Sequence, residues 1–354
     1  MMIMQVRAWI GSTRIVAATF VLLATANVAG AESRETLQQQ AKALFGVIPA
    51  EAPNAANPIT DAKVELGRLL YFDPRISKSQ EISCNSCHKL DTFGVDNEAT
   101  SSGHKGQRGG RNSPSVYNAA FHVAQFWDGR AADVEEQAKG PVLNPIEMGM
   151  PDPGHVLAVL KSIPGYPPLF AKAFPGEKDP VTYDNFGKAV GAFERKLTTP
   201  SPFDDFLGGK LDALTDAQVA GLAKFIEVGC PTCHMGPTVG GLMFQKLGLV
   251  NAYETKDLGR YEATKKDADK HFFKVPSLRN SAKTGPWFHD GSIQSLDEAI
   301  RLMAWHQLGK KLDAADITSI AAFLNSLTGK PDATYIAQPK PLPSGPDTPK
   351  PDPS

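Results

Sequence analysis

The arrangement of hydrophobic and polar residues along the chain indicates helices that are buried on one face. Residues 216–228 and 313–327 place apolar side chains at helical spacing, and the second stretch runs into a Gly-Lys-Pro stop. Residues 61–72 and 186–197 show a comparable pattern. The apolar positions of the first two stretches are Val219, Leu222, Phe225, Ile226, Ile317, Ile320, Phe323, Leu324 and Leu327. The pattern predicts an all-α fold.

Length and composition extend this prediction to two domains. The chain has 354 residues, of which 42% are hydrophobic, and a formal net charge of −1. This length suits about two domains, and the near-neutral charge gives no reason to expect nucleic-acid binding. The 31 Gly and 28 Pro residues predict long irregular connections between helices. Residues 331–354 are Pro-rich without a packing face, so we expect a disordered tail.

The first 31 residues have the pattern of a secretory signal peptide. Arg7 and Arg14 precede an apolar run over residues 15–28, which is followed by Ala-Gly-Ala. This order predicts cleavage before Glu32 and export, in a bacterium to the periplasm. The alternative is an uncleaved anchor, although the apolar run is short for a membrane span.

Two C-x-x-C-H motifs contain all four cysteines of the chain. They are Cys84, Cys87 and His88 in CNSCH, and Cys230, Cys233 and His234 in CPTCH. In an exported protein four cysteines could form two disulfides, and a single motif could be a redox disulfide or half of a zinc site. Two copies, with no further cysteine to complete zinc sites, indicate two covalent haem c groups, each with the adjacent histidine on the iron.

The two halves of the chain are related beyond these motifs. Residues 113–138 align without gaps with residues 275–300, and 8 of the 26 positions are identical. Repetition on this scale predicts a duplicated domain. We therefore expect two cytochrome c-like helical haem domains, over residues 32–200 and 201–330.

The two copies differ in the residue available as a second axial ligand. Met303 lies on a predicted helix after the second repeat, whereas the equivalent stretch of the first repeat has no methionine. A thioether opposite a histidine raises the haem potential, although an isolated methionine can also be core filler. Met235 and Met243 are weaker candidates. We expect electrons to enter at a high-potential second haem, ligated by His234 and Met303, and a small oxidant to bind at the first.

The chain closely resembles the bacterial dihaem cytochrome c peroxidases, whose relatives include MauG-type enzymes. The resemblance covers about residues 40 to 330 and rests on segments such as CNSCH, GHKG, QFWDGRA, CPTCH, FKVPSLRN, WFHDG and MAWHQLG. It implies that the low-potential N-terminal haem is the peroxide site. His104, in a Gly-rich loop, would be its displaceable ligand opposite His88. Trp127 would relay electrons between the haems, and Gln137 and Glu147 would lie in the peroxide pocket.

The resemblance also implies a calcium ion bound by the Asn112 side chain and by the backbone carbonyls of Thr284 and Pro286. Oxygen ligands of this kind suit a hard cation. The implied electron donor is a small periplasmic cytochrome c or a blue-copper protein, and the implied assembly is a homodimer.

The expected activity is reduction of hydrogen peroxide to water. Two alternatives stay open. One is a non-catalytic dihaem electron-transfer protein, in which both irons are permanently six-coordinate. The other is a MauG-like enzyme that oxidises a protein, against which Met303 argues because those enzymes place a tyrosine there.

Overall fold

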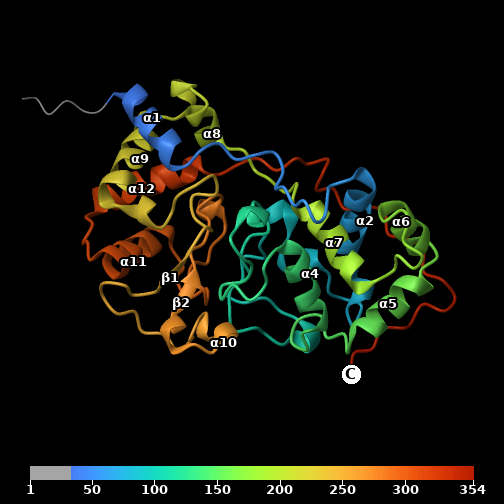
Figure 1. Cartoon of the computed structure of the whole chain (residues 1–354). Helices are drawn as coiled ribbons and strands as arrows, with labels where there is room; N and C mark the ends of the chain where they lie inside the picture. Colours follow the sequence, from blue (N-terminus) through green and yellow to red (C-terminus); the bar gives the residue numbers. More distant parts are fainter. Residues whose placement is uncertain (1–32) are drawn as a thin grey trace, which may run out of the picture. The chain divides into compact units, whose positions relative to one another are not determined.

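The computed structural model describes residues 33–354 and is rich in helix (Figure 1). The signal-peptide prediction lies outside these residues. The helices are α1 (Arg34–Leu44), α2 (Asp61–Phe72), α3 (Cys84–Cys87), α4 (Val134–Leu143), α5 (Pro153–Ser162), α6 (Tyr166–Ala173), α7 (Tyr183–Glu194), α8 (Pro202–Leu207), α9 (Asp216–Val228), α10 (Tyr261–Thr264), α11 (Leu296–Leu308) and α12 (Ala314–Ser326). None of the helices in this range is long and apolar enough to cross a membrane.

The all-α expectation left out one small sheet. Strands β1 (Phe244–Lys246) and β2 (Phe272–Lys274) pair in antiparallel fashion, with Phe244 opposite Lys274. Each strand has only three residues, which is too short for an alternating pattern to stand out in the sequence. The fold is therefore helix-rich with little strand.

The four predicted helices are present, and local capping sets their ends. The predictions over 61–72 and 216–228 coincide with α2 and α9, and the prediction over 313–327 matches α12 to within one residue at each end. Gly229 ends α9 in the left-handed conformation, with φ of 96°. The prediction over 186–197 is three residues late, because the Thr182 side chain accepts the Asn185 N–H and starts α7 earlier.

Two separate apolar cores lie within the compact unit Arg34–Ser354. The first is built mainly from α2, α4, α5, α6 and α7, and the second from α1, α8, α9, α11 and α12. Each has one closely packed helix pair, α2 with α7 and α9 with α12. In both pairs a glycine permits the approach, since a Cβ at Gly67 or Gly221 would collide with a backbone carbonyl of the partner helix.

The N-terminal end of the described chain belongs to the second core, which corrects the expected boundary at residue 32. Leu37, Ala41 and Phe45 pack with residues of α8 and α9. The Gln38 side chain donates to the Leu207 carbonyl over 2.7 Å. The apolar face of α1 predicts that the helix is buried on one side, but it does not predict which core the helix joins.

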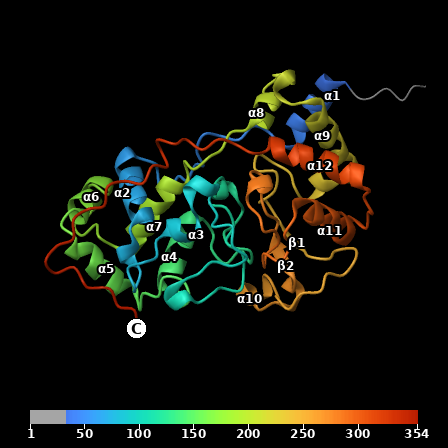
Figure 2. The same ribbon diagram turned by 180° about the vertical axis from the view of Figure 1, so that it is seen from behind.

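The expectation of a tail without a packing face is wrong. Residues after Lys330 cross to the first core, as Figure 2 shows for the red segment that passes α2, α6 and α5. The Tyr335 ring stacks on Phe193 with centroids 5.1 Å apart, and its hydroxyl donates to the Phe193 carbonyl. Leu342 also packs against this core. The contacts are made by the few apolar side chains among the prolines, and the high proline content of the segment gave no sign of them.

The repeated segments have matching backbones. Asn118 and Asn280 both have φ of 61°, and the amide groups of both donate to the Thr199 hydroxyl. A β-bridge joins Gln125 with Ala131, and its counterpart joins Trp287 with Ile293 at the aligned positions. These segments lie between the two cores, next to the candidate site.

Candidate functional site

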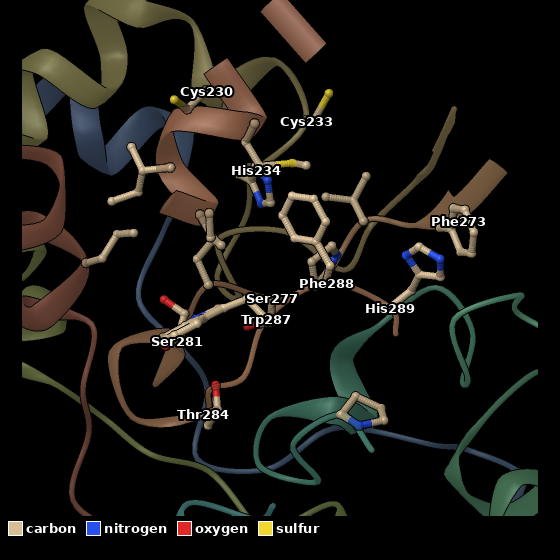
Figure 3. Close-up of a pocket in the computed structure, with 18 of the residues that line it drawn as sticks. Cys230, Cys233, His234, Phe273, Ser277, Ser281, Thr284, Trp287, Phe288 and His289 are labelled. Atoms are coloured by element: carbon tan, nitrogen blue, oxygen red, sulfur yellow. The ribbon is translucent and has the colours of Figure 1, made fainter. Parts of the chain in front are cut away.

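The second C-x-x-C-H motif forms one end of a large apolar cavity. Helix α9 ends at Gly229, and a short turn over Cys230–Thr232 presents the motif. Cys230, Cys233 and His234 line the cavity, and in Figure 3 they lie at the end opposite Thr284. The space left free by its walls, part of it open to solvent, is about 1820 Å³, enough for a flat macrocycle.

Met303 lines the same cavity as His234. It lies on α11, whose residues Leu296, Ile300 and Leu308 provide further apolar wall. A histidine and a thioether facing one apolar space, with two thiols at its end, are the groups that hold a c-type haem. The residues present therefore fit this cofactor.

Burial keeps the His234 imidazole neutral. It lowers the pKa of His234 to about 4, opposed by the backbone carbonyls of Val239 and Pro276. His234 Nδ1 is buried, and none of the described residues forms a hydrogen bond of regular geometry with it. A neutral imidazole has the free lone pair that an iron ligand requires.

The first C-x-x-C-H motif is held by local hydrogen bonds. Ser83 and Ser86 form a capping box around α3. His88 Nδ1 donates to the Pro114 carbonyl over 3.0 Å, and the Tyr71 hydroxyl donates to the His88 carbonyl over 2.6 Å. Bonding Nδ1 to a carbonyl fixes the ring and leaves Nε2 as the ligand atom. Burial also lowers the pKa of His88.

His104 is a buried histidine whose ring has no partner. Its side chain is only 5% exposed, and among the described residues neither Nδ1 nor Nε2 finds a hydrogen bond. Its backbone N–H donates to the Glu147 carbonyl over 2.7 Å, and its ring packs against Gly149. Buried imidazoles without partners are costly, so this ring fits a ligand position at an iron.

Glu147 lies beside the His104 backbone with its carboxylate partly satisfied. Asn144 Nδ2 donates to Glu147 Oε1 over 2.8 Å. Burial raises the pKa of Glu147, while Arg130 and the Asn144 bond oppose the shift. Gln137 lies on α4, and among the described residues no hydrogen bond joins it to Glu147 or to His104. The structure brings His104 and Glu147 together and shows no hydrogen bond from Gln137 to either among the described residues.

Trp127 and the three residues expected to bind calcium line the cavity of the second motif. They are Asn112, Thr284 and Pro286. Trp127 Nε1 donates to the Asn112 carbonyl over 2.9 Å, and the Asn112 side-chain amide donates to the Glu98 carbonyl. No cluster of three or more His, Cys, Asp or Glu suited to a metal occurs in residues 33–354. A calcium site here would therefore depend on neutral amide and carbonyl oxygens, which is the donor set expected for it.

The structure supports neither disulfides nor zinc sites, which the sequence had left open for the four cysteines. No disulfide joins any two of the four cysteines, and neither motif belongs to a cluster of three or more metal-binding side chains within the described residues. Burial raises the pKa of Cys87 to about 11 and that of Cys230 to about 12. These thiols are neither paired in disulfides nor grouped for zinc.

Sequence reasoning missed two polar groups at the centre of the molecule. Arg111 bonds Asp128 in the first half and Asp257 in the second, over 2.6 and 2.7 Å. Lys274 is buried on the cavity wall, and beside it the half-buried His122 has a buried Nε2 atom. One indication in the sequence that Lys274 is buried was its position as a single lysine inside the mainly apolar run HFFKV.

Comparisons with known proteins agree with this geometry. Residues 61–212 match the family model described as di-haem cytochrome c peroxidase. The chain is 46% identical to cytochrome c551 peroxidase of Pseudomonas aeruginosa over 84% of this chain and 87% of the relative. It is 44% identical to cytochrome c551 peroxidase of Nitrosomonas europaea, over 86% and 92%. A crystal structure of a MauG-like protein associated with microbial copper homeostasis superposes with a TM-score of 0.72 at 27% identity, covering 86% of this chain and 97% of that protein.

Proposed function

This chain belongs to the di-haem cytochrome c peroxidase family and is a cytochrome c peroxidase; we propose that its two haem positions divide the work. Peroxide is reduced near His88 and His104, and electrons enter near His234 and Met303. The overall reaction takes hydrogen peroxide, two electrons and two protons to two waters. The observation that carries this division is the buried, unpartnered His104 ring in the first half, beside the His234 and Met303 pair in the second.

The haems, when bound, would relay the donor's electrons and provide the iron at which peroxide is reduced. His88 and His234 would each hold one haem iron, and the adjacent cysteine pairs would attach the haems through thioethers. Met303 completes the second site and raises its potential.

His104 closes the first site in the oxidised protein and leaves it on reduction of the second haem. Its loop, residues 100–112, suits such a movement. Gly106, Gly109 and Gly110 have no atom within 4 Å of the place where a Cβ would stand. Lys105 adopts φ of 59°, which is unfavourable for a residue with a side chain. Gly103 by contrast packs closely against the backbone of Ile146 and Glu147, so the part of the loop that can rearrange at low cost is the stretch that follows His104.

Glu147 moves the proton that peroxide cleavage requires. Heterolysis of the O–O bond needs a proton taken from one oxygen and given to the departing one, and a carboxylate can do both. The carbonyl of Glu147 holds the His104 N–H, so release of the loop also changes the surroundings of this carboxylate. Gln137 orients the peroxide from α4.

The electron donor docks at an apolar patch beside the second motif. Met235, next to His234, is 42% exposed, and Leu242 and Val123 are also exposed large hydrophobic residues. Leu242 packs over Gly236, and the Val123 N–H donates to the Gly241 carbonyl, so the three residues adjoin. A small cytochrome c or a blue-copper protein fits such a surface, and Trp127 carries the electrons onward.

The proposal also covers the location of the protein, its assembly and its calcium ion. Cleavage before Glu32 delivers the protein to the periplasm, as a homodimer. A calcium ion held by Asn112, Thr284 and Pro286 stabilises the junction of the two halves. The matching backbones of the two repeated segments support an origin of the haem domains by duplication.

Steady-state turnover with reduced cytochrome c tests the activity. We expect peroxide-dependent oxidation of two cytochromes per peroxide consumed. A dihaem electron carrier would show no turnover at any redox poise, and a MauG-like enzyme would instead oxidise a protein partner without consuming reduced cytochrome c.

A further inference from the structure

Lys274 is a buried ammonium group without a counter-ion. It ends strand β2, is 5% exposed and lines the cavity of the second motif. No carboxylate within residues 33–354 forms an ion pair with it. Its single recorded side-chain partner in that range is His122 Nδ1, 3.4 Å from Nζ. Burying a charge without an opposite charge is strongly unfavourable.

His122 presents a second donor beside this ammonium. Since Nζ of Lys274 donates to Nδ1, the imidazole proton lies on Nε2. Nε2 is buried, and no acceptor for it exists among the described residues. The ring is held tightly, because a side chain at Gly241 would collide with it. Two buried donors on adjacent side chains therefore lack an acceptor.

The cavity wall supplies no anion to satisfy them. No described residue that lines the cavity is Asp or Glu. The other strong cation on the wall, Arg279, is already paired with Asp204 through two bonds of 2.7 Å. The missing carboxylate must arrive with whatever fills the cavity, and a haem carries two propionates. Burial lowers the pKa of Lys274 to about 8, and a bound carboxylate would oppose this shift.

We propose that Lys274 and His122 bind a propionate of the second haem. The inference rests on the proposed second haem and adds to it the residues that anchor its carboxylate edge. The backbone N–H of Lys274 also donates to the Trp127 carbonyl over 2.8 Å. The same residue therefore holds the propionate and positions the tryptophan that adjoins the cavity.

This anchor raises the reduction potential of the second haem. The ammonium neutralises the propionate, whose negative charge would otherwise favour the oxidised iron. With Lys274→Met the propionate loses its counter-ion, so the potential falls and becomes dependent on pH across the range in which the propionate ionises.

Redox titration of the purified dihaem protein at several pH values tests the proposal. We expect Lys274→Met to lower the equilibrium constant for reduction of the second haem about tenfold at neutral pH, equal to a fall of about 59 mV, and to add a pH dependence. His122→Asn should lower it two- to threefold, by removal of one donor. The matched control is Lys246→Met, an exposed lysine on the paired strand β1, which should leave the potential unchanged.

Haem content measured on the same samples separates the possible failures. A wild-type chain that carries fewer than two haems contradicts the proposed function itself. Two haems with an unchanged potential and pH profile in Lys274→Met overturn the propionate site alone. If Lys274→Met loses the second haem, the His122→Asn variant provides the test. A lower potential of the second haem in that variant supports the propionate site, and an unchanged potential overturns it.

Discussion

Single residues on the far side of each haem position distinguish the two halves. The proposed proximal groups are alike, since both motifs supply two cysteines and a half-buried histidine whose pKa is lowered. The proposed distal ligands differ: His104 comes from a Gly-rich loop, whereas Met303 comes from the helix α11. A ligand on a helix is held by the helix backbone, and a ligand on a loop is free to leave.

Met303→Leu tests the ligand of the second site. Loss of the thioether should lower the potential of the second haem and reduce turnover with cytochrome c at least tenfold, because electrons no longer enter favourably. Redox titration and steady-state rates measure both effects. The control is Met243→Leu, and equal potentials in the two variants would show that Met303 is not a ligand.

Glu194→Gln tests a buried carboxyl group near the first motif. Burial, reinforced by Glu135, raises the pKa of Glu194 to about 8. The folded protein therefore keeps a proton that the unfolded chain releases near pH 4.5, so ionisation weakens the fold as pH rises from about 4.5 to 8. The variant should match wild type at the acid end of this window and gain stability towards pH 8, by on the order of a few kcal/mol.

Chemical denaturation across that pH window measures the difference. Glu298→Gln is the control on an exposed carboxyl, whose hydrogen bond with Arg301 lowers its pKa. Its effect should have the opposite sign, a loss of stability above pH 4.5. A Glu194→Gln curve parallel to wild type throughout would refute the buried-proton account.

Residue-level prediction succeeded where chemistry is local in sequence. The two C-x-x-C-H motifs, each only five residues long, were sufficient to predict haem c, which membership of the di-haem family supports. The role of His104 stays a prediction. The burial of Lys274 was not predicted, because a lysine between phenylalanine and valine has the pattern of an exposed position on a strand. Its burial depends on His122, Trp127 and the cavity, which are distant in sequence.

At the scale of elements, periodicity identified helices but not their partners. The α2 and α7 pair and the α9 and α12 pair follow from apolar faces and from the close approach at Gly67 and Gly221. The position of α1 in the second core and of the C-terminal segment on the first depends on long-range contacts. Such contacts leave no periodic signal in a short segment.

Tyr335→Ala tests the docked C-terminal segment. It removes the stacking on Phe193 and a hydrogen bond to the Phe193 carbonyl. We expect a loss of about 2 kcal/mol in the free energy of unfolding, measured by denaturant titration. The exposed neighbour Thr334→Ala should change it little, and equal stability of the two variants would mean that the segment is not docked in solution.

At the scale of the molecule, Arg111 connects the His104 loop to both halves. It bonds Asp128, Asp257 and Glu262, and it precedes Asn112, whose carbonyl accepts the Trp127 N–H. Asn112 also donates its backbone N–H to the His289 carbonyl. The end of the loop is therefore fixed to the second half, and the open positions at Gly106, Gly109 and Gly110 lie between this end and His104. In the proposed arrangement, this connection would link the second haem site to the His104 loop.

Electron paramagnetic resonance of the oxidised and half-reduced protein, beside His104→Gly, tests the displaceable ligand most directly. In wild type the first haem should be low-spin when oxidised, with His88 and His104 on the iron, and should change when the second haem is reduced. In His104→Gly it should already be high-spin in the oxidised form. A first-haem spectrum identical to wild type in both forms would show that His104 is not a ligand.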